Sequence, residues 1–358
     1  MPLTRFHGFN HKKRLGTSQP PPSTLSAWQG EDLSIVIPSY NACSLLRKTL
    51  SAVVSSLPKA EVIVVDGSSQ DGSPEMVLRE FAGVHLVRVT NHGFAHATNQ
   101  GLEKSTRPLI LLLNSDVFVT FPALLAMRER LSSNPKIGAV GPRLLNKDGS
   151  RQWLFGPFYW PNWVNIYRPT RVWLLSAACL MTRRDVLEAV GGLDESFFLY
   201  NEEYDWCLRV AKQGFLLELL PQGVIHVGGG STSPHPSLIL EAQRGFVYLT
   251  SKHAPKSITN LLRHAMLLEG FCYSRLDPRR EYRQMWAQLE SIMRRRTYTE
   301  SPFPLSGRGD RLARPQSLSF PSTNRNPKKS IHFLASHTQS GDEKPAPPAC
   351  AYSATAAP

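Results

Sequence analysis

A polar cluster follows a fully apolar run near the middle of the chain. The run Leu111–Leu113 leads directly into Asn114, Ser115 and Asp116. A carboxylate at the end of a buried strand suits a hard divalent cation, because Mg²⁺ and Mn²⁺ prefer oxygen ligands and leave coordination positions for phosphate oxygens. The same residue types are also common in turns at strand ends. The cluster therefore predicts either a site for a metal-bound diphosphate or an ordinary turn.

Two adjacent carboxylates, Glu202 and Glu203, begin an amphipathic segment that continues through Ala211. Asn201 before them is typical of a helix N-cap, and Gly214 is typical of the residue that follows a helix. Acidic residues in a first turn stabilise the helix through its dipole. A carboxylate can also take a proton from a reacting hydroxyl, so the pair has both a structural and a catalytic interpretation.

His226 stands before three glycines at the end of another apolar stretch, where an isolated histidine is either a packing residue or a ligand. The turn after the first expected strand, 33–37, reads Pro38-Ser39-Tyr40 and lacks the glycine patterns of dinucleotide-binding folds and phosphate-loop enzymes. Hydride transfer and ATP hydrolysis are therefore disfavoured.

Short apolar strands alternate with helices in the first part of the chain. We expect strands at 33–37, 61–65, 84–89 and 109–113, and helices at 44–56, around 76–81 and at 94–104. Continuous apolar strands separated by helices predict an α/β fold with a parallel sheet covered on both faces. Ligands bind such sheets at the carboxyl ends of the strands, which is where Pro38, Asp66 and Asp116 fall.

The net charge of +13 is distributed unevenly over the 358 residues: +4 in residues 1–30, zero in 31–250 and +9 in 251–358. A balanced middle segment argues against nucleic acid as a ligand, because binding to a phosphate backbone needs basic residues on the folded surface. The basic ends could instead contact an anionic surface.

The five cysteines are scattered and never form a C-x-x-C pair, which indicates neither a disulfide framework nor a zinc site. The stretch 173–181 is too short to span a membrane, and 1–30 lacks the apolar core of a secretory signal. We therefore expect a cytoplasmic protein, with a contact at the inner face of the cell membrane as an open alternative.

Six motifs follow one another between residues 33 and 233. They are SIVIPSYN (34–41), VVDGSSQDGS (64–73), NHGFAHATNQG (91–101), LLLNSDV (111–117), FFLYNEEYDWCLR (197–209) and HVGGGST (226–232). In this order they resemble the motifs of the family 2 glycosyltransferases, most closely the rhamnosyltransferase-like branch. The resemblance implies a GT-A fold, with a mostly parallel nucleotide-binding sheet flanked by helices.

The resemblance also implies a nucleotide-sugar donor at the carboxyl edge of the sheet. The family's nucleoside contacts correspond to Pro38, Tyr40 and Asp66. The family segment that lines the donor pocket corresponds to Asn91, Gly93, Phe94 and Asn99. Asp66 in a turn and Gly93 at a helix start have structural explanations as well.

Metal and proton-transfer roles follow from the same resemblance. Asp116 matches the family's metal-binding aspartate, with Asn114 in place of the first acid of its D-x-D-like motif. His226 matches a later ligand of the metal, Mg²⁺ or Mn²⁺, or of the diphosphate. Glu203 matches the general base, although aspartate is usual there, and Glu202 is the alternative base.

These roles together describe an inverting, metal-dependent glycosyltransferase. A cation on the diphosphate stabilises the leaving group, while a carboxylate activates the acceptor hydroxyl. No nucleophile arrangement that favours double displacement was found in the sequence. The expected donor is a dTDP- or UDP-sugar, with rhamnose first, and the acceptor is a cell-surface glycan or a lipid-linked one. A catalytically silent sugar-binding or assembly protein with the same fold is the alternative.

The sequence divides into four segments. We expect a disordered basic tail at 1–30, the GT-A domain at 31–250, accessory amphipathic helices at 251–296 and a disordered tail at 297–358. The helix 278–296 carries an apolar stripe with Met285 and Leu289, bordered by arginines. Such a stripe either lies on an anionic bilayer or covers an apolar patch of the protein.

Overall fold

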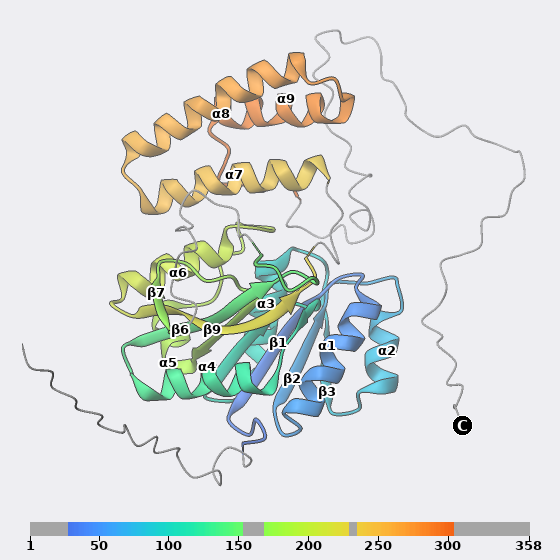
Figure 1. The fold of residues 1–358 in the computed structure, drawn as a ribbon. Coiled ribbons are helices and arrows are strands. Elements are labelled where there is room, and N and C mark those ends of the chain that lie inside the picture. Colours follow the sequence, from blue (N-terminus) through green and yellow to red (C-terminus); the bar gives the residue numbers. More distant parts are fainter. Residues whose placement is uncertain (1–27, 153–167, 229–234, 304–358) are drawn as a thin grey trace, which may run out of the picture.

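The computed structural model describes residues 28–152, 168–228 and 235–303. Most of the two expected tails, 1–27 and 304–358, lies outside the described residues. The described chain forms a layer of sheet with helices on both faces, and a separate layer of helices stands over one end of it (Figure 1).

The first part of the chain alternates strands and helices as expected. The elements are β1 (Leu33–Ser39), α1 (Cys43–Ser56), β2 (Glu61–Asp66), α2 (Ser73–Glu80), β3 (Val84–Arg88), α3 (Phe94–Lys104) and β4 (Leu109–Leu113). The four strands pair in the order β3-β2-β1-β4, and every pair is parallel. Every residue of β1 and β4 is buried, which explains their continuous apolar sequence.

The second part completes the sheet with strands of both directions. The elements are β5 (Val117–Phe118), α4 (Phe121–Ser133), β6 (Ile137–Leu145), β7 (Thr170–Val172), β8 (Cys179–Arg183), α5 (Arg184–Val190), α6 (Glu202–Lys212) and β9 (Leu216–His226). The order continues β4-β8-β6-β9-β5, with β7 also on β9. Strand β8 is antiparallel to β4 and β6, so the sheet is mixed in this part.

Apolar side chains hold helices on both faces of the sheet. Helices α1, α2 and α4 pack on one face, where the main core lies. Helices α3, α5 and α6 pack on the other face. The two-sided covering confirms the α/β arrangement that the apolar strands predicted.

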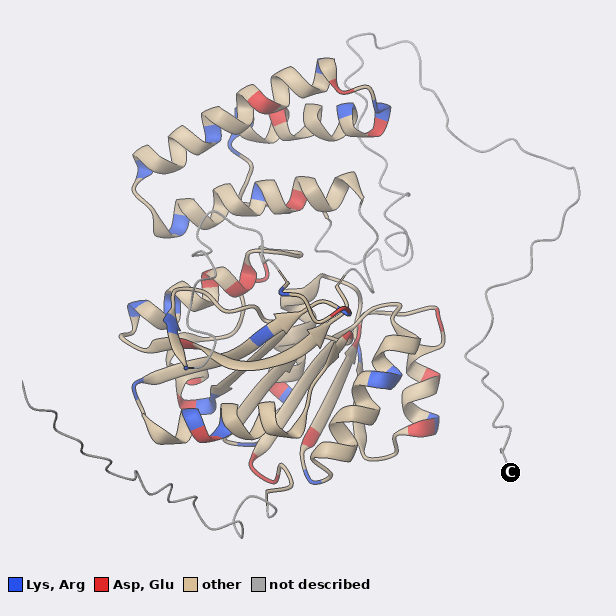
Figure 2. Cartoon of the chain, in the orientation of Figure 1, with Lys and Arg blue, Asp and Glu red and all other residues tan. Residues whose placement is uncertain are grey.

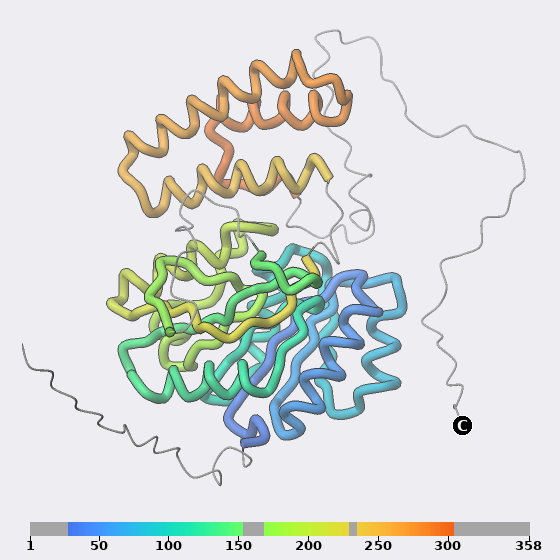
Figure 3. The backbone as a smooth tube through the Cα atoms, in the orientation of Figure 1, coloured from blue at the N-terminus to red at the C-terminus, as the bar shows by residue number. Residues whose placement is uncertain are grey.

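Three helices follow the sheet: α7 (Pro236–His253), α8 (Lys256–Leu276) and α9 (Arg280–Arg295). We predicted α8 and α9 but not α7, which lies between the sheet domain and the other two helices (Figure 3). Met285, Leu289 and Met293 of α9 are fully buried in a core shared with α7 and α8. The apolar stripe of α9 therefore covers its helical neighbours and does not face outward.

Residues 297–303 belong to the expected C-terminal tail, yet they pack on the domain. The Phe303 ring stacks on the Phe198 ring, with centroids 4.2 Å apart. Ser301 donates a hydrogen bond to Glu241. The expectation of disorder was wrong for this stretch, because its apolar and polar groups find partners on α7 and on the segment before α6. No described helix is long and apolar enough to cross a membrane.

We predict that Gly101→Ala lowers thermal stability, although alanine favours helices over glycine by about 1 kcal/mol. A Cβ at Gly101 of α3 would lie 2.3 Å from Val36 Cγ1 and 3.0 Å from Val65 Cγ2, both on buried strands. Overpacking of this kind costs about 1–3 kcal/mol, which outweighs the helix preference. Gly83→Ala, which meets nothing within 4 Å, is the control in thermal unfolding. A Tm of Gly101→Ala at or above that of the parent would contradict this packing argument.

Candidate active site

Asp116 and His226 lie together at the edge of the sheet. The short strand β5 pairs antiparallel with the end of β9, so that Val117 stands opposite His226. The Asp116 carbonyl accepts a hydrogen bond from the Val227 amide, and Asp116 Oδ1 lies 3.3 Å from His226 Nε2. Two residues 110 positions apart are therefore held in contact by the pairing of two strand ends.

The hydrogen bonds of Gln152 orient the His226 ring. Gln152 Nε2 donates to the His226 carbonyl at 3.4 Å, so its Oε1 is the atom 2.6 Å from His226 Nδ1. In this arrangement Nδ1 donates to the amide oxygen, and Nε2 is the ring nitrogen that faces Asp116 Oδ1. A cation between the carboxylate and the imidazole satisfies both atoms. Sequence reasoning missed Gln152, because nothing in its neighbourhood marks it as a partner of a residue on β9.

These residues fit an oxygen-preferring divalent ion. Asp116 is 6% exposed, and Asn114 Oδ1 is buried without a hydrogen-bond partner. Within the described ranges, no group of three or more His, Cys, Asp or Glu residues could hold a metal ion. A carboxylate and an imidazole alone leave most coordination positions to diphosphate oxygens and water, as is usual for Mg²⁺.

The predicted nucleoside contacts lie along the neighbouring strand ends. Pro38 pairs with Val65 and Ser39 with Asp66, which brings the ends of β1 and β2 together. Asp66 is 1% exposed; its Oδ2 accepts from the Ser69 amide, whereas its Oδ1 has no partner. Burial raises the pKa of Asp66 and outweighs these hydrogen bonds. The unpartnered acceptor is available to a donor group of a ligand.

Tyr40 extends this edge toward the loop before α3. Burial raises the pKa of the Tyr40 hydroxyl, against the opposing effect of its hydrogen bonds with Asn41 and Asn91. Asn91 Oδ1 in turn accepts from the Gly93 amide at 3.2 Å. Tyr40, Asn91 and Gly93, which we predicted from separate motifs, therefore form one hydrogen-bonded chain.

Gly93 and Phe94 contact the segment that leads into α6. The Phe94 amide donates to the Phe198 carbonyl at 2.7 Å. Gly93 has a φ of +97°, and a Cβ there would lie 2.2 Å from the Phe198 carbonyl oxygen. Only glycine tolerates both the backbone angle and the contact. The donor motif and the acidic motif are thus joined directly.

Asn99 is engaged with protein groups on both of its polar atoms. Its Nδ2 donates to the Leu193 carbonyl and to Glu195, and its Oδ1 accepts from the Leu193 amide. Glu195 Oε2 also contacts His96 Nδ1 at 2.8 Å. In this structure Asn99 therefore ties α3 to the loop before α6, and we assign it a positioning role within the donor segment.

Glu202 is buried and Glu203 is half-buried at the start of α6. Glu202 is 3% exposed, and Oε2 of each glutamate is buried without a hydrogen-bond partner. Burial, together with the charges of Glu203 and Glu241, raises the pKa of Glu202 well above its ordinary value. Burial raises the pKa of Glu203 to about 7. Stabilisation of the helix dipole alone does not require this burial, because carboxylates in a first turn interact with the dipole while solvated.

The Asn201 cap that we predicted is absent, although the helix begins where expected. Asn201 has a φ of 73° and makes no side-chain cap; its Nδ2 donates instead to the Ala242 carbonyl of α7. The Asn201 side chain bonds to α7 and not to the first turn of its own helix, because α7 lies close to this segment. Gly214, with a φ of 85°, follows the helix as predicted.

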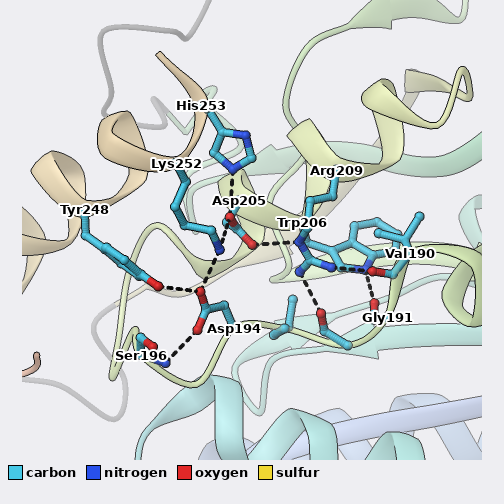
Figure 4. A network of polar contacts seen from close by, with 12 residues as sticks. Val190, Gly191, Asp194, Ser196, Asp205, Trp206, Arg209, Tyr248, Lys252 and His253 are labelled. Carbon is cyan, nitrogen blue, oxygen red and sulfur yellow. Dashed lines mark hydrogen bonds and ion pairs between the residues drawn. The ribbon is translucent and has the colours of Figure 1, made fainter. Parts of the chain in front are cut away.

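An ionic network connects α6 to α7 (Figure 4). Asp205 is fully buried and binds Arg209, Lys252 and His253. Lys252 also contacts Asp194, 2.6 Å away, in the loop before α6. These contacts lower the pKa of Asp205 despite its burial. In Figure 2 the acidic start of α6 accordingly lies between the sheet and the helical layer.

Comparison with known proteins identifies the class of this domain. Residues 34–205 match the family model described as glycosyl transferase family 2. The chain therefore carries a family 2 glycosyltransferase domain, which confirms the resemblance of its motifs, and the protein is a glycosyltransferase. It is 28% identical over 262 residues to the N-acetylglucosaminyl-diphospho-decaprenol L-rhamnosyltransferase of Mycobacterium tuberculosis, covering 62% of this chain and 85% of that protein.

Solved structures with a similar fold agree with this assignment. S. aureus TarS 1–349 in complex with UDP has a TM-score of 0.51 at 14% identity, covering 73% of this chain and 80% of that 1–349 chain. GalNAc-T7 with UDP, GalNAc and Mn²⁺ has a TM-score of 0.50 at 16% identity, covering 75% of this chain and 55% of that one. At these identities the likeness concerns the fold alone, which is the expected GT-A fold.

We predict that Glu202→Gln stabilises the protein at pH 8 but not at pH 4. A carboxyl whose pKa is higher in the folded than in the unfolded chain destabilises the folded state as pH rises above the unfolded pKa. Glutamine removes this penalty, so we expect the Tm at pH 8 to rise by at least about 2–4 °C, which corresponds to about 1 kcal/mol. The shift is measured against the parent at each pH.

The exposed Glu188→Gln serves as the control and should change the Tm at neither pH. A Glu202→Gln shift of equal size at pH 4 and pH 8 would mean that the titration of the buried carboxyl is not its cause.

Proposed function

We propose that this glycosyltransferase is inverting and metal-dependent, and that it transfers a sugar from a nucleotide diphosphate donor to an acceptor hydroxyl. The observation that carries the proposal is the combination of the Asp116–His226 pair with the half-buried Glu203, whose Oε2 is buried without a hydrogen-bond partner. The first suits a chelated diphosphate, and the second suits a general base. A purely sugar-binding protein would need neither.

The leaving diphosphate lies, in this proposal, beside Asp116 and His226. These two residues would hold Mg²⁺ or Mn²⁺, which when bound neutralises the charge that grows on the diphosphate as the glycosidic bond breaks. The protein itself orients the imidazole through Gln152 and shields Asp116 from solvent. Both features keep the site arranged before the donor arrives.

The acceptor hydroxyl loses its proton to Glu203 as its oxygen attacks the anomeric carbon. A base with a pKa of about 7 is well matched to neutral pH, where it is partly ionised and still basic enough to take the proton. Attack by the acceptor opposite to the leaving group, without an enzyme nucleophile, inverts the anomeric centre. Glu202 remains the alternative base, since it is buried and its Oε2 also has no hydrogen-bond partner.

A UDP- or dTDP-sugar is the proposed donor. Asp66 Oδ1 is a buried acceptor without a partner, and the N3–H group of a uracil or thymine ring is a donor of matching chemistry. Both bases present this edge, so the proposal covers both nucleotides. The similarity to a mycobacterial L-rhamnosyltransferase supports rhamnose as the transferred sugar.

A lipid-linked or cell-surface glycan is the proposed acceptor, which makes the inner face of the cell membrane the proposed place of action of a cytoplasmic enzyme. The name of the mycobacterial relative includes a diphospho-decaprenol group, which is a lipid carrier. Such an acceptor would sit in a bilayer, and an enzyme that acts on it needs a surface for that bilayer.

Helix α8 offers such a surface on its outer side. Leu261 and Leu268 are 67% and 63% exposed, and Ile258, Phe271 and Leu276 are exposed beside them. Residues 254–303 carry nine basic and five acidic side chains. An exposed apolar helix face in a basic segment suits an anionic membrane surface. We propose that α8, in place of the α9 stripe that the sequence suggested, contacts the bilayer.

We predict that Glu203→Gln lowers kcat by about 10²–10⁴-fold without loss of donor binding, because glutamine cannot accept the proton. Release of nucleoside diphosphate is measured from UDP- and dTDP-sugars with Mg²⁺ or Mn²⁺ and an acceptor glycan. In the parent, kcat/KM should fall about tenfold per pH unit below about 7, since the base works when deprotonated.

Glu188→Gln, an exposed glutamate on α5, is the control and should match the parent. Full activity of both Glu203→Gln and Glu202→Gln would exclude a carboxylate base in α6. A parent that releases no nucleotide from any donor would favour the catalytically silent alternative.

We predict that the double variant Leu261→Glu/Leu268→Glu reduces binding to vesicles that contain anionic phosphatidylglycerol, because it places charge on the apolar face. Cosedimentation is compared with that of the parent at low salt, and the exposed Leu78→Glu on α2 serves as the control. Unchanged vesicle binding would count against α8 as the contact. A shift from dimer to monomer without vesicle binding would instead assign the face to a second copy of the chain.

A further inference from the structure

We infer that the buried ion pair Glu241–Arg244 of α7 is a positioning device for the general base: it fixes the segment Ser196–Asn201, which leads directly into Glu202 and Glu203. The inference rests on the proposed function, because it gives these glutamates their catalytic role. According to this inference, the helical layer α7–α9 contributes to catalysis by positioning the general base.

The backbone before the two glutamates adopts an unfavourable conformation. Tyr200 and Asn201 have φ angles of 70° and 73°, in the left-handed region that residues other than glycine rarely adopt. Two such residues in succession persist only where surrounding contacts hold them. The direction in which α6 starts, and hence the location of Glu202 and Glu203, depends on these contacts.

The ion pair supplies contacts at the start of the segment. Glu241 and Arg244 both have fully buried side chains. Glu241 Oε1 accepts from the Phe198 amide at 3.0 Å, and Arg244 Nη2 donates to the Ser196 carbonyl at 2.9 Å. The pair therefore binds the main chain on both sides of residue 197, which leaves the segment little freedom to shift.

Other groups of α7 hold the end of the segment. The Ala242 carbonyl accepts from Asn201 Nδ2 at 3.1 Å. Gly245 lies against the same residue, because a Cβ there would be 2.9 Å from Asn201 Nδ2 and 3.3 Å from Phe197 Cδ1. The glycine lets α7 approach the left-handed turn more closely than a larger residue would.

The segment is also held from its opposite sides. The Phe198 carbonyl accepts from the Phe94 amide in the donor segment, and the Phe198 ring stacks on Phe303. Arg244 Nη1 donates to the Tyr298 carbonyl, which fixes the stretch that carries Phe303. The ion pair thus lies between the donor segment and the C-terminal stretch and contacts the acidic motif from α7.

A buried ion pair is poorly explained by stability alone. Removal of two charges from water costs free energy that their attraction only partly returns, and apolar residues of similar size often stabilise a protein equally well. The hydrogen bonds of Glu241 and Arg244 go instead to specific main-chain atoms of the segment 196–201. These hydrogen-bond partners favour a role in fixing the geometry of the segment 196–201.

The test is a double variant, Glu241→Leu/Arg244→Met, which removes both charges and keeps the buried volume. We expect a folded protein whose kcat falls by about 10²-fold, because a displacement of about 1 Å at a reacting group has an effect of that size. The UDP affinity should change far less than kcat, since Asp66 and Asp116 lie on other elements.

Arg263→Met is the matched control. Arg263 of α8 is also buried and donates to the Met293 carbonyl of α9, so this hydrogen bond stays within the helical layer and does not reach the segment 196–201. We expect a lower Tm with an unchanged kcat. Gly245→Ala is a second, milder variant that pushes on Asn201 without removing a charge, and it should lower kcat with unchanged UDP affinity.

Two outcomes would overturn the inference: full kcat in both the double variant and Gly245→Ala, or equal losses of kcat and UDP affinity in both. Glu203→Gln is measured alongside. If Glu203→Gln and Glu202→Gln are both fully active, the proposed function itself fails. If Glu203→Gln is inactive while the α7 variants keep their kcat, only the positioning role fails.

Discussion

Two successive glutamates at the start of α6 each have one carboxylate oxygen that is buried without a hydrogen-bond partner, and the contacts around them keep these atoms there. Burial of an unpaired carboxylate is unfavourable, so the fold must compensate elsewhere. It does so through neighbours: the ionic network of Asp205 below the first turn, and the hydrogen bonds of α7 to the preceding segment. The same burial gives Glu203 a pKa of about 7, which a solvated glutamate would not have.

Asp116 and His226 are held by a different kind of contact. Both residues depend on strand pairing at the rim of the sheet, and Gln152 adds the orientation of the imidazole ring. The residues proposed to contact the nucleoside depend on the parallel pairing of β1 with β2. Rigid sheet edges thus hold the groups that would bind the donor, whereas helix packing holds the groups that would act on the acceptor.

The sequence predicted those parts of the molecule that depend on local pattern. Continuous apolar strands with helices between them indicated the parallel half of the sheet, and the order of six motifs indicated the family. The contact between Asp116 and His226 also followed from the motif order. Strand β8 and helix α7 were missed, because antiparallel pairing and the burial of Arg244 depend on partners distant in sequence.

Asn201 and Asn99 illustrate why residue type alone did not give every role. Asparagine before a helix usually caps it, but Asn201 bonds to α7 because that helix is close. Asn99 belongs to a motif that we predicted to bind the donor, yet both of its polar atoms bind the loop around Leu193. In each case the side-chain amide forms its hydrogen bonds with a neighbour that the local sequence pattern does not reveal.

The contact between Gly93 and the Phe198 carbonyl has a consequence for how this sequence can change over generations. The two positions lie more than a hundred residues apart, yet no side chain can be added at the first unless the backbone at the second moves away. Such a movement would carry the acidic helix with it. Inheritance of the loop that carries Gly93 and of the acidic motif is therefore linked, and exchange of either one between relatives succeeds only when both come from the same parent.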